Sequence, residues 1–212
     1  MTDKLKRRDV LAGAAALAAA GPVMAQTPAA PAPADGIIRV SLQTTAGEIV
    51  LGLESVKAPL TTANFLRYID AKRYDGGTFY RTMRSDTPTA APWGLIQGGS
   101  DRKKPRFPGV AHESTTQTGL SNTTGAIALA RAAPGSATSD FFISVGDMKG
   151  LDADPKAEGD DLGFAAFGHV ISGMDVAQKI HQMSTSAEAE VEAMRGQMLA
   201  TPVVITTAKR VV

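Results

Sequence analysis

The chain has 212 residues, of which 43% are hydrophobic and 20% are charged, and its formal net charge at pH 7 is +1. This length suits one domain of good size with short appendages. Because Lys and Arg nearly balance Asp and Glu, the composition offers no electrostatic footprint for nucleic acid or an acidic membrane surface. Cysteine is absent, which excludes disulfides, thiolate catalysis, Cys-ligated metals and a lipidated-cysteine anchor.

The first 25 residues have the pattern of an export signal. A basic stretch over positions 4–8 precedes an apolar, alanine-rich run over 10–20, and residues 23–25 fit a small-x-small cleavage site. The run is too short for a transmembrane helix, which needs about 20 apolar residues. Arg7-Arg8 partly resembles a twin-arginine signal, and an ordinary Sec signal is the alternative. We expect cleavage directly after this site, a periplasmic location and no membrane anchor.

A linker and two strands follow the signal. Residues 26–36 are rich in Pro and Ala and lack large apolar side chains, so we expect a disordered or polyproline-like linker. The folded domain is expected over residues 37–212. Apolar and polar residues alternate over 38–43 and again over 49–53, with a Gly-containing turn between them. This period of two predicts two strands joined by a short turn.

The period then changes over residues 59–72, where apolar residues recur with helical spacing and Pro59 suits the first turn of a helix. A strand is expected over 78–83, with Phe79, Arg81 and Met83 on one side of the sheet. Shorter apolar runs bounded by turn residues predict further strands over 95–97, 126–131, 141–145, 164–171 and 202–212.

The C-terminal third also contains helical spacing. A helix is expected over residues 173–183, and Thr185 with Glu188 could form a capping box that opens a third helix to Arg195. Several short strands with two or three helices fit a closed antiparallel barrel with helices at its ends. Strand periodicity alone does not separate such a barrel from a sandwich.

Three motifs occur in order on apolar, strand-like segments: Phe79-Tyr80-Arg81, Gln97-Gly98-Gly99 and Asp140-Phe141-Phe142-Ile143. They supply one cation, one amide and a pair of aromatic rings, a set that suits a reaction without bond cleavage. Their order resembles that of the cyclophilins, the peptidyl-prolyl cis-trans isomerases, and the likeness extends over residues 37–212. The resemblance implies a mainly β fold, a closed eight-stranded antiparallel barrel capped by two helices, and no cofactor.

The resemblance also implies roles for single residues. Arg81 matches the arginine that stabilises the twisted X-Pro amide, and a guanidinium suits this task because it is a rigid, permanently charged donor. Gln97 matches the amide that holds the substrate backbone, and Phe142 matches the floor of the proline pocket. Further residues at substrate-binding positions are Leu95, Ala130, Arg131, Asp140, Leu151 and Phe164.

Several pocket positions depart from the family pattern. Arg131 replaces an Asn and Asp140 replaces a Gln. Because both residues depart, we expect them to form a compensating ion pair, with an Asp140–Arg81 pair as the alternative.

Aromatic positions depart as well. Gly94 replaces an aromatic residue, and Trp93 is the candidate to fill its space. Gly150 replaces a Trp, and Phe164 replaces the pocket His.

Metal chemistry has little support, because the three histidines lack ligand spacing and Asp152-x-Asp154 begins a calcium-loop pattern that Lys156 and Ala157 do not continue.

Taken together, these patterns and the resemblance predict a monomeric, cofactor-free prolyl isomerase that acts outside the cytoplasm on proline-containing polypeptides. A non-catalytic peptide-binding or chaperone-like module on the same barrel is the first alternative. A hydrolase with an unrecognised triad is the second.

Overall fold

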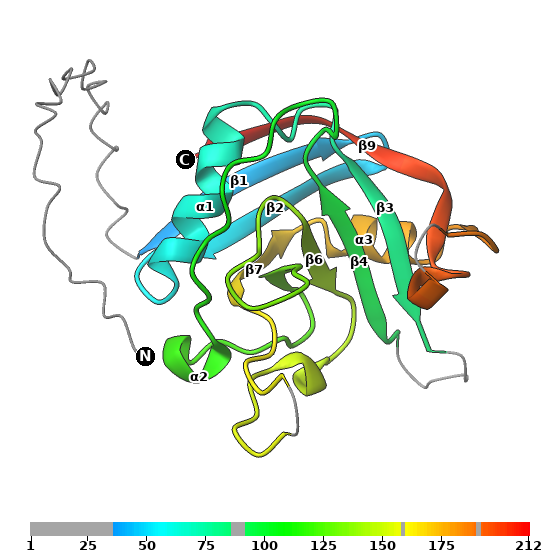
Figure 1. The fold of residues 1–212 in the computed structure, drawn as a ribbon. Helices are drawn as coiled ribbons and strands as arrows, with labels where there is room; N and C mark the ends of the chain where they lie inside the picture. Colours follow the sequence, from blue (N-terminus) through cyan, green and yellow to red (C-terminus); the bar gives the residue numbers. More distant parts are fainter. Residues whose placement is uncertain (1–35, 86–91, 158–159, 190–191) are drawn as a thin grey trace, which may run out of the picture. The chain divides into compact units, whose positions relative to one another are not determined.

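The computed structural model describes residues 36–85, 92–157, 160–189 and 192–212 (Figure 1). The expected signal and all but the last residue of the expected linker lie outside the described residues, so both stay predictions. Within the described residues, no helix is both long enough and apolar enough to cross a membrane.

The described strands form one antiparallel sheet that closes on itself. Its order is β1-β2-β7-β5-β6-β4-β3-β9-β8, and an additional pairing of β1 with β9 closes the barrel. Eight strands make up the barrel, and the short β8 pairs with β9 at its edge. The strands are β1 (Ile37–Thr44), β2 (Gly47–Glu54), β3 (Thr78–Arg84), β4 (Gly94–Gly99), β5 (Ala126–Leu129), β6 (Phe141–Ser144), β7 (Ala166–Ser172), β8 (Thr185–Ser186) and β9 (Met198–Val211). The predicted eight-stranded antiparallel barrel is confirmed.

The first hairpin shows how local sequence builds this sheet. Strands β1 and β2 pair from Ile37 opposite Glu54 to Thr44 opposite Gly47. The Thr44 hydroxyl accepts hydrogen bonds from the backbone N–H groups of Ala46 and Gly47, at 3.0 and 3.1 Å. Gly47 has a φ of 139°, which an L-residue rarely adopts, so the glycine is required for the turn. The period of two in the sequence thus becomes a closed hairpin.

Helices α1 (Pro59–Asp70) and α3 (Met174–His181) form where helical spacing predicted them. Helix α1 packs on β2 and β9, and α3 packs on β2, β3 and β4. Shorter helical turns are α2 (Thr115–Thr118), η1 (Lys149–Leu151) and η2 (Glu192–Met194). In Figure 1 the two longer helices lie on different sides of the barrel.

The expected third helix is wrong. Thr185 and Ser186 form β8, where Thr185 pairs with Leu199 of β9, and helical structure in the described residues returns only at η2. The backbone N–H of Glu188 donates to the Ser186 hydroxyl, so of the expected capping pair Thr185 lies in a strand and Glu188 in a turn. Pairing with a long neighbouring strand therefore overrides local helical spacing.

Strand β3 also differs from its prediction. Its pairing with β4 and with β9 shifts register between Phe79 and Arg81, as a β-bulge does. Phe79 is buried in the barrel core and Thr82 is buried where its hydroxyl donates to the carbonyl of His181, whereas Arg81 and Met83 line an outer cavity. The expectation that Phe79 shares a side with Arg81 is wrong, because the bulge changes the alternation at Tyr80.

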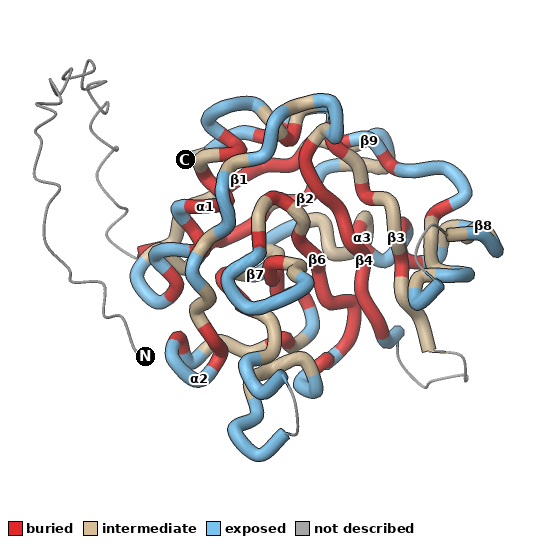
Figure 2. Tube along the Cα trace, in the orientation of Figure 1, coloured by how far each residue is buried: buried red, intermediate tan, exposed pale blue. Residues whose placement is uncertain are grey.

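A group of aromatic rings packs together in the core of the barrel, among many aliphatic side chains. Phe141 packs edge-on against Phe65, Tyr74 and Phe79, with ring centroids 5.3 to 5.6 Å apart. These side chains are fully buried, and Figure 2 shows buried segments along several strands of the barrel. The next residue, Phe142, belongs to a second, smaller apolar cluster with Leu95, Ala128, Met148 and Ala166. Adjacent residues of β6 thus serve two faces, one of them the floor of the outer cavity.

Candidate active site

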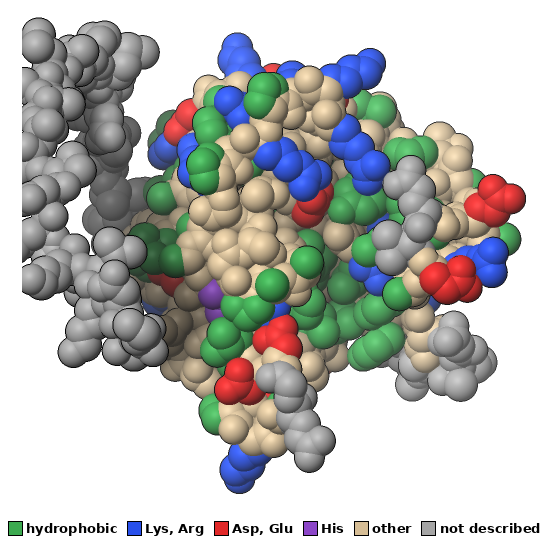
Figure 3. Space-filling model, viewed as in Figure 1, with side chains coloured by type: hydrophobic (Ala, Val, Ile, Leu, Met, Phe, Trp, Pro, Cys, Tyr) green, Lys and Arg blue, Asp and Glu red, His purple; other side chains and the backbone are tan. Residues whose placement is uncertain are grey.

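A cavity of about 190 Å³ opens on the outer face of β3, β4 and β6. Hydrophobic side chains gather over these strands where the surface is hollowed (Figure 3). Eight of the nine residues predicted for the site line this cavity, and the ninth, Asp140, does not. Met83 and Met194 line it without having been predicted. The full lining is Arg81, Met83, Leu95, Gln97, Ala130, Arg131, Phe142, Leu151, Phe164 and Met194.

Arg81 is held in place by two side-chain amides. Its Nη1 donates to Oε1 of Gln97 at 2.7 Å, and its Nη2 and Nε both donate to Oε1 of Gln197, at 2.6 and 2.9 Å. Burial lowers the pKa of Arg81, but a guanidinium stays protonated at physiological pH. Since both partners are neutral, they orient the guanidinium without neutralising it.

Gln97 is fixed at both ends of its amide. Its Oε1 accepts from Arg81, and its Nε2 donates to the Tyr80 hydroxyl at 2.8 Å. The Tyr80 hydroxyl in turn faces Oδ1 of Asp140 at 3.4 Å. Burial, and then the charge of Asp140, raise the pKa of Tyr80 well above its usual range, so this phenol stays neutral. One N–H of the Gln97 amide remains for a ligand.

Asp140 pairs with neither arginine proposed from the sequence. Its Oδ2 lies 2.9 Å from Nη1 of Arg106, which comes from the long loop between β4 and α2. Gly99 makes room for this carboxylate, because a Cβ there would lie 2.0 Å from Oδ1 of Asp140. The expected Arg131–Asp140 pair and its Arg81 alternative are therefore both wrong.

Arg131 instead ties down the acidic loop between β6 and β7. Its Nη1 and Nη2 donate to the carboxylate of Asp160 at 2.6 and 2.9 Å, and its Nε donates to the carbonyl of Gly163 at 3.1 Å. The hydrogen bond to Arg131 is the main cause that lowers the pKa of Asp160. This arginine lies beside the cavity as part of an ion pair.

The floor of the cavity is apolar. Phe142 and Phe164 meet edge to face, with ring centroids 5.5 Å apart. Leu95, Ala130 and Leu151 complete the floor, and the described residues that line the cavity include no acid and no Ser, Thr or Cys nucleophile. Such an apolar surface suits a small saturated ring.

The substitution at Gly94 has a steric cause. Gly94 has a φ of 130°, and a Cβ there would lie 1.9 Å from the carbonyl oxygen of Met83. No side chain fits at this position. Trp93, the expected substitute, is 39% exposed and is not among the residues that line the cavity.

The calcium-like motif serves the fold. Oδ1 of Asp152 accepts hydrogen bonds from the backbone N–H and the side-chain amide of Asn122, at 2.7 and 2.8 Å. In the described part of the chain, no group of three or more His, Asp or Glu residues is placed to hold a metal ion.

Comparison with known proteins places the chain in a family. A family model described as cyclophilin type peptidyl-prolyl cis-trans isomerase/CLD matches residues 39–209. The chain belongs to this cyclophilin family. Peptidyl-prolyl cis-trans isomerase A of Dickeya dadantii is 38% identical over 175 residues, which cover 80% of this chain and 83% of the relative. Peptidyl-prolyl cis-trans isomerase B of Escherichia coli is 34% identical over 157 residues, covering 69% of this chain and 85% of the relative.

Solved structures support the fold of this cyclophilin. A cyclophilin-type isomerase of Cryptosporidium parvum aligns with a TM-score of 0.59 at 15% identity, covering 83% of this chain and 98% of that one. The same protein, crystallised in the presence of the dipeptide Ala-Pro, aligns with a TM-score of 0.57 at 16% identity over 82% of this chain and 99% of that one. At this identity the likeness speaks for the barrel alone.

Sequence reasoning missed the residues that support the predicted ones. Gln197 lies in a segment without periodicity, directly after the falsely expected third helix, so no local pattern marked it. Arg106 lies in a long polar loop. Tyr80 stands inside the first motif, but its hydroxyl reaches Gln97 only because the bulge turns it outward.

Proposed function

We propose that this cyclophilin catalyses cis-trans isomerisation of X-Pro bonds in unfolded or loop segments of polypeptides, with Arg81 as the transition-state donor. The observation that carries the proposal is the arrangement of Arg81: two neutral amides hold it beside an apolar floor. The site therefore offers an oriented, uncompensated cation next to a surface that fits a proline ring.

The chemistry of the reaction explains why this arrangement is useful. An X-Pro bond resists rotation with a barrier of about 18–20 kcal/mol, because its nitrogen lone pair is conjugated with the carbonyl. Twisting the bond localises that lone pair on the proline nitrogen. A hydrogen bond from an N–H of Arg81 to this nitrogen is stronger in the twisted state than in either planar state. Only such preferential binding of the twisted state accelerates the reaction.

The remaining residues hold the substrate. The proline ring would rest on Phe142 and Phe164, and the free N–H of the Gln97 amide would donate to a substrate carbonyl. Because Gln97 is already fixed by Arg81 and Tyr80, binding the substrate costs little further ordering of this side chain.

A direct test measures proline-limited refolding of a test protein and NMR exchange of a proline peptide, both with purified protein. We expect acceleration of both processes with no change in peptide mass. Peptide binding without acceleration would favour the non-catalytic module, and loss of peptide mass would favour a hydrolase.

We also propose that the enzyme works after export, as residues 1–25 suggest. The mature chain would begin at Gln26, and N-terminal sequencing of the protein from periplasmic and cytoplasmic fractions tests this. Replacing Arg7-Arg8 with Lys-Lys should block export if the twin-arginine route is used, whereas unchanged export would indicate the Sec route. An uncut chain confined to the cytoplasm would contradict the proposal.

A further inference from the structure

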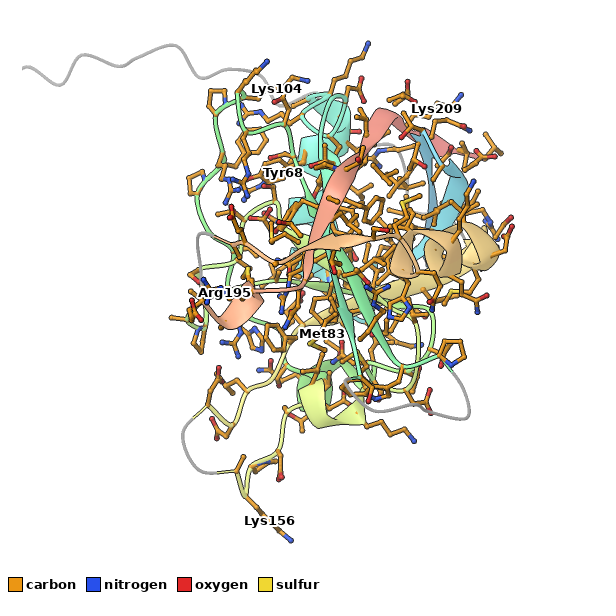
Figure 4. All side chains as sticks on the ribbon, turned by 90° about the vertical axis from the view of Figure 1, so that its right-hand side faces the viewer. Tyr68, Met83, Lys104, Lys156, Arg195 and Lys209 are labelled. Atoms are coloured by element: carbon orange, nitrogen blue, oxygen red, sulfur yellow. The ribbon has the colours of Figure 1, made fainter. Side chains whose placement is uncertain are left out.

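A second, larger hollow lies beside the proline cavity. Its volume is about 670 Å³, against about 190 Å³ for the cavity itself. Met194 lines both, so one side chain forms the wall between them. The rest of the second hollow comes from Tyr80 on β3, Arg102 in the loop after β4, and four described residues from β8 to the start of β9, namely Ser186, Glu188, Ala189 and Met198. Figure 4 views this side of the molecule, with Arg195 labelled directly after η2 and Met83 labelled on β3.

The walls of the hollow are mainly apolar and adaptable. Met194, Met198 and Ala189 are half-buried along one side. Tyr80 also lines the hollow, while its hydroxyl accepts a hydrogen bond from Gln97. Methionine side chains are flexible and polarisable, so they can fit side chains of different shapes.

The charged residues of the hollow balance each other. Arg102 and Glu188 are both exposed, and the Arg102 guanidinium lies 5.5 Å from the centroid of the Tyr80 ring. With one cation and one anion among the described residues that line it, the hollow shows no strong preference for the charge of a ligand. Its chemistry selects a large apolar side chain.

A substrate that extends from the cavity past Arg81 toward β9 passes near this hollow. Tyr80 is the residue before Arg81, and Met198 pairs with Arg81 across β3 and β9. Consecutive residues of an extended chain are spaced about 3.3–3.6 Å apart, so a residue next to the proline, or one further along, reaches from Arg81 to the hollow.

We propose that this hollow binds a large apolar side chain within two positions of the substrate proline, and that it gives the enzyme a sequence preference. The inference rests on the proposed isomerase function and adds a substrate class to it. The occupant is the substrate polypeptide itself, because the hollow and the proline cavity share Met194.

The test uses the full-length chain and short peptides that contain one proline. Gly, Ala, Leu or Phe is placed in turn at each of the two positions before and the two positions after the proline, and kcat/KM is measured by NMR exchange. We expect Leu or Phe at one of these positions to raise kcat/KM at least about fivefold over Gly, mainly through a lower KM.

Variants then locate the preference. Ala189→Trp fills the hollow and should abolish the preference while the all-Ala peptide turns over at the wild-type rate. Ala193→Trp is the matched control, since Ala193 is exposed in the same segment and lies outside the lining. Met198→Ala should weaken the preference by removing one wall, and it provides a second probe should Ala189→Trp fail to fold.

Two results would overturn the inference: equal kcat/KM for all flanking residues in the wild-type protein, or equal loss of preference in Ala189→Trp and Ala193→Trp. Failure of the proposed function looks different, because the wild-type protein would then turn over none of the peptides, the all-Ala peptide included.

Discussion

Arg81 and Arg131 line the same cavity, but their partners differ in charge. Arg81 donates three hydrogen bonds to two neutral amides, those of Gln97 and Gln197. Arg131 donates to the carboxylate of Asp160 and to the carbonyl of Gly163, and its side chain is only 2% exposed. One guanidinium is therefore oriented with its charge uncompensated, and the other is neutralised in a structural ion pair.

This difference shows which cation can act on a substrate. An amide carbonyl orients an arginine more weakly than a bidentate carboxylate does, but it leaves the positive charge available for a developing lone pair. The charge of Arg131 is instead neutralised by Asp160, in the loop that leads to Phe164. Proximity to the cavity therefore does not by itself identify the donor, whereas the charge of its partners does.

Removing each arginine in turn should have the largest effects. Arg81→Ala should lower kcat/KM about a hundredfold, because one transition-state donor is lost, and Arg81→Lys should recover little since the planar fork is gone. Arg131→Ala should change the melting temperature more than the rate. Peptide exchange kinetics and thermal melts of the three variants check this. Equal rate losses for Arg81→Ala and Arg131→Ala would remove the distinction.

Changing the partner of Arg81 tests its uncompensated charge. Gln197→Met keeps the side-chain length but removes the acceptor, and we expect about a tenfold loss of kcat as Arg81 becomes less ordered. Gln197→Glu keeps the acceptor and adds a negative charge, so it should lower kcat further by neutralising Arg81.

Single-turnover or exchange measurements on both variants decide between these outcomes. Gln178→Met is the control, since Gln178 is an exposed glutamine on α3. Wild-type kcat in Gln197→Glu would mean that the neutrality of the partner has no bearing on catalysis.

Acid should lower the stability of the fold through His181, a buried histidine that contacts the strand carrying Arg81. His181 is 2% exposed, and its Nε2 lies 3.1 Å from the carbonyl oxygen of Met83 on the strand that carries Arg81. Burial lowers the pKa of His181 below its ordinary 6.5. Between the folded and unfolded pKa values the unfolded chain binds more protons, so this contribution to stability is complete above about pH 6.5 and declines as pH falls through the folded pKa.

Thermal melts of wild type and His181→Gln from about pH 8 to pH 5 measure this contribution, since histidine changes charge in that range. The wild-type melting temperature should fall more steeply below pH 6.5 than that of the variant. Parallel curves would show that His181 carries no such linkage.

The smallest effects concern the partners of Arg131. A double-mutant cycle of Arg131→Asn with Asp160→Asn should show coupling in the free energy of unfolding that decreases with added salt, because Asp160 is exposed. The cycle of Arg131→Asn with Asp140→Gln should be additive, since Asp140 pairs with Arg106 instead. Coupling in the second cycle and none in the first would reverse the assignment. Denaturant unfolding provides the measurements.

The sequence by itself determined the features that depend on short-range patterns. Alternation over β1 and β2 and helical spacing over α1 and α3 specified these elements within a few residues of their observed bounds. The order of the three motifs, read through its family resemblance, identified Arg81, Gln97 and Phe142, and these three side chains line one cavity. Strands and helices are predictable in this way because apolar side chains at every second residue of a strand, or every third to fourth residue of a helix, form one buried face.

Only the tertiary structure decided which groups surround those residues. Gln197 reaches Arg81 across 116 positions of sequence, and Asp140 meets an arginine from a loop without periodicity. The bulge in β3 and the pairing of β8 with β9 likewise follow from how neighbouring strands meet. These contacts depend on barrel closure, and no local pattern encodes which distant loop will supply a partner.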